Sequence, residues 1–106
     1  MPRTGFDVPA CLSRRAASLP FARECVYERR SSLVSRAIEA QDGAARGLPV
    51  HLISMNDQVC ATALCPVVQR GVVVFTDDNH LTSSFARSVA PVLGERIARV
   101  MAAGAH

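Results

Sequence analysis

The stretch VVVFTDDNHLT, residues 72–82, places a β-branched run, a polar segment and the start of a helix next to one another. The β-branched run favours a strand, and the apolar residues that follow Thr82 recur at helical spacing. The Thr82 hydroxyl suits the position just before a helix, Pro91 is expected to kink or divide that helix, and Gly104 is expected to end it. These residues therefore predict a strand, a short polar loop and a terminal helix.

The segments before this stretch predict elements of both kinds. Two β-branched runs joined across Gly71 predict a hairpin. Residues 28–41 show the spacing of a helix with one buried stripe, and Gly43 is its expected stop. The apolar run Pro49–Met55 predicts a buried parallel strand, and Asn56–Pro66 is expected to be a loop that holds two cysteines.

Residues 1–27 are expected to be irregular, because proline and glycine interrupt every periodic pattern there. Residues 28–106 are then expected to hold, in order, a helix, a strand, a cysteine loop, a hairpin, a polar loop and the terminal helix. Such mixing of helices and strands is typical of the α/β class. Since one parallel strand needs neighbours in a sheet, we interpret the sequence as the end of an α/β fold.

The length and the charge exclude several classes of protein. The 106 residues fit one domain, and no apolar run is long enough to span a membrane. The net charge is +3, but the arginines are scattered and no aromatic residues alternate with them, which argues against nucleic-acid binding. The first residues lack the apolar stretch of a signal peptide, so an export signal is expected upstream of Met1.

The four cysteines permit two disulfides or a zinc site. Four cysteines allow three disulfide connectivities, and disulfides would indicate an oxidising compartment. Structural zinc usually requires closely spaced pairs at both ends. Cys60 and Cys65 could form one such pair, but Cys11 and Cys25 are too far apart for the other. The spacing favours disulfides.

The polar loop contains the residues best suited to catalysis. Asp77 precedes His80 by three residues, so its carboxylate can accept a hydrogen bond from the imidazole Nδ1–H and fix the tautomer. The other ring nitrogen is then free to take a proton from a nucleophile. The same pattern also occurs in polar loops that merely cap a helix, and that interpretation stands beside the catalytic one.

Three blocks together resemble the SGNH-hydrolase superfamily, and more closely the extracytoplasmic C-terminal domain of bacterial membrane acyltransferases that O-acylate cell-surface glycans. The first block is Val72–Thr82 with its Asp-x-x-His pattern followed by Leu and Thr. The second is Val59–Val68, which is similar to the family's disulfide loop. The third is Phe6–Leu12, with Cys25 as the later partner of its cysteine. The resemblance covers nearly the whole chain.

The resemblance implies a three-layer α/β/α flavodoxin-like fold, of which this chain is the C-terminal part. It implies the disulfides Cys11–Cys25 and Cys60–Cys65, and it implies catalytic roles for Asp77 and His80 without any cofactor. The family's Gly-Asp-Ser nucleophile block does not occur in the sequence, and neither do its oxyanion-hole glycine and asparagine blocks. We therefore expect the chain alone to be inactive.

The implied partners are an acyl donor and a glycan hydroxyl acceptor, reached through the full-length domain, and an N-terminal transmembrane acyltransferase domain that this sequence lacks. The implied location is the extracytoplasmic side, periplasmic or cell-surface, as part of an inner-membrane protein. Transfer to water instead of sugar would make an esterase with the same residues. Two alternatives remain: a small secreted, disulfide-stapled interaction protein, and a metal module that uses cysteines with His80.

Overall fold

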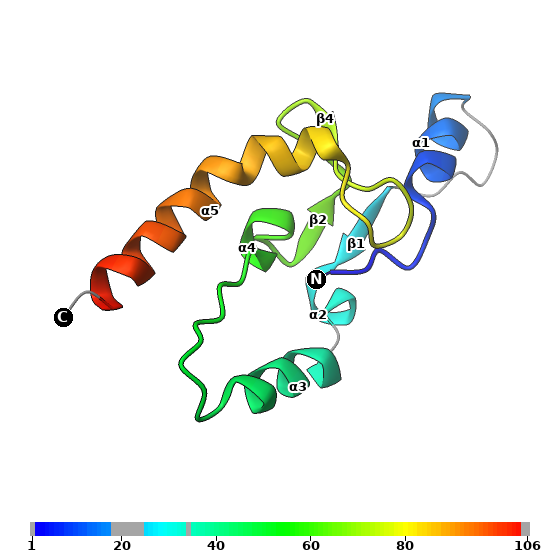
Figure 1. Ribbon diagram of the computed structural model, residues 1–106. Coiled ribbons are helices and arrows are strands. Elements are labelled where there is room, and N and C mark those ends of the chain that lie inside the picture. The colour runs from blue at the N-terminus through cyan, green and yellow to red at the C-terminus, as the bar shows by residue number, and fades with distance from the viewer. Residues whose placement is uncertain (1, 18–24, 34, 105–106) are drawn as a thin grey trace.

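The chain forms short strands at its centre and helices that extend outward from them (Figure 1). The computed structural model describes residues 2–17, 25–33 and 35–104. In chain order the elements are α1 (Val8–Ala16), β1 (Val26–Glu28), α2 (Arg29–Ser32), α3 (Ser35–Ala45), α4 (Asn56–Val59), β2 (Leu64–Pro66), β3 (Val68–Gln69), β4 (Val72–Val73) and α5 (Ser83–Gly104).

The strands form two small antiparallel sheets. β1 pairs with β2, with Tyr27 opposite Cys65, and β3 pairs with β4 across a two-residue turn. That turn consists of Arg70 and Gly71, whose φ angles are +54° and +75°. Positive φ at both central residues matches the twist of a tight hairpin, and glycine adopts it without steric cost. The hairpin lies where the sequence places it.

The core lies where β1, the cysteine loop, the chain after β4 and the start of α5 meet. The rings of Tyr27 and Phe75 pack edge to face, with centroids 5.9 Å apart. Burial raises the pKa of Tyr27 to about 12. The buried apolar residues are Val8, Cys11, Cys25, Tyr27, Val59, Cys60, Cys65, Val67, Val74, Phe75, Phe85 and Val89.

The long helix α5 packs on this core only through its first turns. Phe85 and Val89 are buried, whereas Leu93, Ile97 and Met101, which continue the same stripe, are 36%, 42% and 70% exposed. In Figure 1 the second half of α5 extends away from the sheets. Pro91 lies inside the helix but does not divide it, contrary to one of the expected outcomes.

One bidentate ion pair holds α5 beside α4. The Arg96 guanidinium donates to both carboxylate oxygens of Asp57, at 2.8 and 2.6 Å, and to the carbonyl of Ser54 at 2.6 Å. These hydrogen bonds hold the pKa of the Asp57 carboxyl well below its usual range. The sequence alone does not predict this contact, because 39 residues separate the two partners.

The expectation of an irregular segment over residues 1–27 is wrong for part of that range. Helix α1 occupies Val8–Ala16, and Asp7 caps it by accepting a hydrogen bond from the Ala10 amide at 2.9 Å. Pro9 lies in the first turn, where a helix tolerates proline because those amides lack helical partners anyway. Strand β1 also begins inside this range, and residues 18–24 lie outside the described part.

The prediction of a single helix over residues 28–41 is also wrong. Glu28 ends β1, α2 is one turn long, and α3 begins at Ser35 and continues through Gly43 to Ala45. The Arg29 amide donates to the Ala63 carbonyl at 2.9 Å, which extends the pairing of β1 with β2. Pairing with a distant strand therefore overrides the helical pattern at the start of this segment.

The strand expected at Pro49–Met55 is absent, and these residues form an extended connection without a strand partner in the described chain. Val50 and Leu52 are 50% and 55% exposed, so the run is not buried either. A strand requires a neighbouring edge to accept its backbone hydrogen bonds. The prediction of a loop over Asn56–Pro66 is only partly right, since α4 and β2 lie within this segment.

Two disulfides fasten the chain near the core. Cys11 is bonded to Cys25, with Cα atoms 6.0 Å apart, and Cys60 is bonded to Cys65, with Cα atoms 5.3 Å apart. A zinc site binds cysteine sulfurs as thiolates, and sulfurs joined in disulfides cannot serve as such ligands. The four cysteines are therefore not available to the metal module considered from the sequence. The mixture of helices and small sheets fits the α/β class, although the strands described are all antiparallel.

Candidate catalytic dyad

The loop between β4 and α5 is closed at its base by backbone hydrogen bonds. Phe75 and Leu81 form an isolated antiparallel bridge. Inside that bridge the Thr76 amide donates to the His80 carbonyl at 2.8 Å. Phe75 is fully buried, so the first residue of the bridge is fixed in the core. The loop is therefore a short, braced turn rather than a free connection.

The second side of the loop is fixed by the start of α5. The Thr82 amide donates to the Val74 carbonyl at 2.8 Å, and the Thr82 hydroxyl donates to the Val73 carbonyl at 2.6 Å. The same hydroxyl accepts from the Phe85 amide at 3.1 Å, which is the N-cap that the sequence predicts. One side chain thus joins β4, the loop and the helix.

Asp77 organises the loop through both carboxylate oxygens. Oδ1 accepts hydrogen bonds from the amides of Asn79 and His80, at 2.8 and 2.7 Å. Oδ2 lies 2.7 Å from Nδ1 of the His80 imidazole. The two backbone amides, and then the imidazole, lower the pKa of Asp77 from 3.8 to about 2. The carboxylate is therefore ionised at neutral pH and suited to accept a proton-bearing Nδ1.

The His80 ring projects from the loop into solvent. Its side chain is 74% exposed, whereas that of Asp77 is 40% exposed. With Nδ1 held by the carboxylate, the ring is the tautomer that carries its lone pair on Nε2. Within the described residues no group hydrogen-bonds to that nitrogen, so it is free to accept a proton from a reactant.

The N-terminal segment supports the loop from outside. The Thr4 amide and hydroxyl donate to the Asp78 carbonyl at 2.9 and 3.2 Å. The Val8 amide donates to the Asp77 carbonyl at 3.2 Å. In Figure 1 the N-terminal chain and the loop before α5 lie side by side. The contacts between Thr4 and Asp78 could not be predicted from the sequence, because no sequence pattern links residues 74 positions apart.

A family model described as "SGNH domain (fused to AT3 domains)" matches residues 1–95, which is most of the chain. The chain belongs to this family. The match includes α1, both sheets and the whole Asp77–His80 loop of the SGNH chain. No curated protein and no solved structure matches the sequence.

The dyad of the SGNH chain has no serine beside it in the described residues. No described serine hydroxyl lies within hydrogen-bonding distance of His80, and Ser83, the nearest along the chain, is the exposed first residue of α5. The Asp78 carboxylate, in contrast to that of Asp77, has no hydrogen-bond or ion-pair partner among these residues. The geometry thus distinguishes the two neighbouring aspartates as the spacing predicts.

The covalent cross-links indicate where the SGNH chain resides. Disulfides persist in oxidising compartments and are rare in the cytosol, which indicates a location outside the cytoplasm. Among the described helices none is both long and apolar enough to cross a bilayer. Within the same residues no three His, Cys, Asp or Glu side chains gather as metal ligands would.

Proposed function

We propose that Asp77 and His80 are the orienting carboxylate and the general base of an SGNH-type acyl-transfer centre. The observation that carries the proposal is the 2.7 Å contact between Asp77 Oδ2 and His80 Nδ1, in a histidine whose side chain is otherwise exposed to solvent. When an imidazole held in this way is neutral, its lone pair is on Nε2, the nitrogen opposite the carboxylate contact. The carboxylate also stabilises the imidazolium that forms when Nε2 takes a proton.

The nucleophile in this proposal is a serine from a segment that the present sequence does not contain. His80 Nε2 takes the proton of the serine hydroxyl while the serine oxygen bonds to the acyl carbon. The protonated ring then gives that proton to the leaving group of the acyl donor. In the second half-reaction His80 takes a proton from the acceptor hydroxyl as its oxygen bonds to the acyl carbon, and it then gives that proton to the serine oxygen as the bond between serine and the acyl group breaks. A sugar hydroxyl gives an O-acylated glycan, and water gives the free acid.

The biological setting we propose follows the family description, which joins this domain to a second kind of domain. Residues 1–106 would form the C-terminal part of a three-layer α/β/α domain, linked to a transmembrane acyltransferase domain in an inner-membrane protein. The disulfides favour the extracytoplasmic side of that membrane. The reaction would then be O-acetylation of a cell-surface polysaccharide.

The test uses a longer version of the protein in which a Gly-Asp-Ser segment precedes this chain. Release of acetate from a small acetyl ester is measured for the parent and for His80→Ala. We expect the variant to lose about a thousandfold in kcat or more, because the serine loses its base. His51→Ala is the matched control, since His51 is an exposed histidine outside the loop. Equal activity of the His80 variant and its parent would refute the proposal.

A further inference from the structure

A hollow of about 770 Å³ lies on the side of β1 and α2 that faces the cysteine loop. It is lined by the end of β1 and the start of α2, by Leu33 and Ile38, and by residues 61–64 of the cysteine loop. Neither Asp77 nor His80 lines it. Its volume is in the range of pockets that hold small organic ligands. The proposed catalytic centre makes no use of it.

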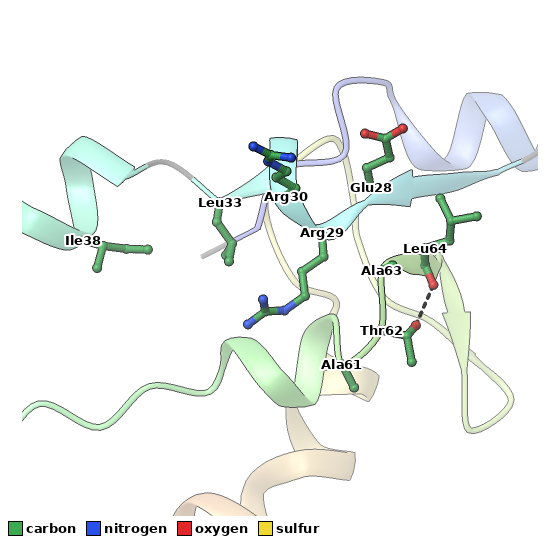
Figure 2. Close-up of a pocket in the computed structure, with 9 residues that line it drawn as sticks. All are labelled: Glu28, Arg29, Arg30, Leu33, Ile38, Ala61, Thr62, Ala63 and Leu64. Carbon is green, nitrogen blue, oxygen red and sulfur yellow. Dashed lines mark hydrogen bonds between the residues drawn. The ribbon is translucent and has the colours of Figure 1, made fainter.

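One charged group points into this hollow. Figure 2 shows the Arg29 side chain crossing the space toward the turn at Ala61, while Glu28 points to the opposite side of the strand. Arg29 Nε donates to the Cys60 carbonyl at 3.1 Å, which fixes the direction of the guanidinium and leaves its two terminal nitrogens available. No carboxylate among the described residues pairs with Arg29 or Arg30. The lining has two arginines, Arg29 and Arg30, and one carboxylate, Glu28, so it keeps a net charge of +1.

Most of the other lining residues are apolar. Leu33 and Ile38 form one side, and the side chains of Ala61 and Ala63 line the other. The Thr62 hydroxyl is already engaged, since it donates to the Leu64 carbonyl at 2.6 Å. A ligand that fits must therefore combine an anionic group with an apolar body, because a charge-assisted hydrogen bond and apolar burial are what the hollow offers.

We propose that this hollow binds an amphipathic organic anion, with its carboxylate or phosphate on the Arg29 guanidinium and its apolar body against Leu33, Ile38 and Ala61. Guanidinium presents paired N–H donors that match the oxygens of either anion. Arg30 also lines the hollow and adds a second positive charge, although its side chain points to the same side as Glu28 (Figure 2). The proposal is independent of the catalytic role of the loop.

The test is a titration of the 106-residue chain followed by backbone amide NMR shifts. The probes are benzoate and phenyl phosphate, with benzyl alcohol as the neutral analogue of the same ring. We expect saturable shifts at Arg29, Leu33, Thr62 and Ala63 with one or both anions, and binding of the alcohol at least about tenfold weaker. The stronger of the two anions identifies the natural head group as a carboxylate or a phosphate.

Three variants make the test specific. Arg29→Gln should weaken anion binding about tenfold or more. Leu33→Glu leaves the Arg29 contacts in place but adds a repelling carboxylate, so it should abolish binding even if Arg29→Gln perturbs the cysteine loop. Arg99→Gln removes the same charge from an exposed position on α5 and should bind like the parent.

Equal weakening by Arg29→Gln and Arg99→Gln would show only general attraction to a basic chain and would overturn the proposal. Equal binding of benzyl alcohol and the anions would also overturn it, because the guanidinium would then contribute nothing. Shifts confined to residues outside the hollow, or no saturable shift with either anion, would have the same consequence.

Discussion

Asp77 divides its two carboxylate oxygens between the backbone and an imidazole. Oδ1 holds the amides of Asn79 and His80, and Oδ2 contacts the His80 ring. Asp78, one position on, contributes only its backbone carbonyl, which Thr4 contacts. At the scale of single residues, the loop therefore offers a test in which two adjacent aspartates act as target and control.

We expect Asp77→Asn to lower kcat in a serine-containing version of the protein, but by less than His80→Ala does, because the loop geometry survives while the imidazolium loses its partner charge. Asp78→Asn should retain most of the activity. Initial rates of acetyl ester hydrolysis, divided by the concentration of folded protein, measure both effects. Greater damage from Asp78→Asn with folding intact would reverse the assignment of the two residues.

The combined variant of Asp77→Asn and His80→Ala adds a second check. Once the base is absent, its orienting partner has nothing to orient, so the double variant should be about as slow as His80→Ala alone. If instead Asp77 only stabilises the loop, Asp77→Asn would lower the melting temperature and leave the rate per folded molecule unchanged.

The same residue predicts an acid transition. The folded state lowers the pKa of Asp77 from 3.8 to about 2, so it favours the ionised carboxylate. That contribution to stability is fully present above pH 3.8 and is lost as the pH falls toward 2. Thermal unfolding followed across this range should show a steeper loss for the parent than for Asp77→Asn. A parent and a variant with parallel curves would contradict the linkage.

At the scale of elements, Thr82 is the point where strand, loop and helix join. Thr82→Ala removes both the N-cap of α5 and the hydrogen bond to the Val73 carbonyl. We expect a loss of about 1–2 kcal/mol in the free energy of unfolding, measured by urea denaturation. Ser84→Ala, at an exposed position in the same helical turn, is the control and should change little.

The disulfides belong to the same scale, since each closes one loop. The bonded residues are 14 and 5 positions apart, for which loop closure contributes about 3 and about 2 kcal/mol. Mass spectrometry of a digest made without reduction should find peptides that join Cys11 to Cys25 and Cys60 to Cys65. A peptide joining Cys25 to Cys60 would contradict the pairing.

The parts of the fold that depend on neighbouring residues were accessible from the sequence. The hairpin at Gly71, the Thr82 cap and the dyad in one loop all follow from residues within a few positions of one another. The pairing of β1 with β2 was not accessible, because it joins Glu28 to Leu64. The strand expected at Pro49–Met55 failed for the related reason that a strand also requires a partner edge.

At the scale of the whole molecule, the chain is more extended than its length requires. Its radius of gyration is 16.4 Å, whereas a compact domain of this size has about 13 Å. The principal extents are 59, 28 and 20 Å, since α3 and α5 project from the centre in different directions (Figure 1). Apolar positions such as Ile97 and Met101 stay exposed on that projection.

At the same scale, we predict that the 106-residue chain alone has no esterase activity on a small acetyl ester. A base without a positioned nucleophile gives little rate, and no described serine reaches His80. Incubation with a chromogenic acetyl ester, monitored for an initial burst, provides the measurement. A burst equal to the protein concentration would contradict the prediction and would direct attention to Ser13, Ser54 and Ser83.

Tyr27 is the only tyrosine in a sequence without tryptophan; its ring packs against Phe75, and its backbone is paired with that of the disulfide-bonded Cys65. The intrinsic fluorescence of this protein therefore comes from one ring in the core. Disulfides quench tyrosine emission at short range, so the native chain should be dim and should brighten when the ring and the Cys60–Cys65 bond separate. The emission of one side chain then reports whether β1 still lies against β2, the strand that carries Cys65.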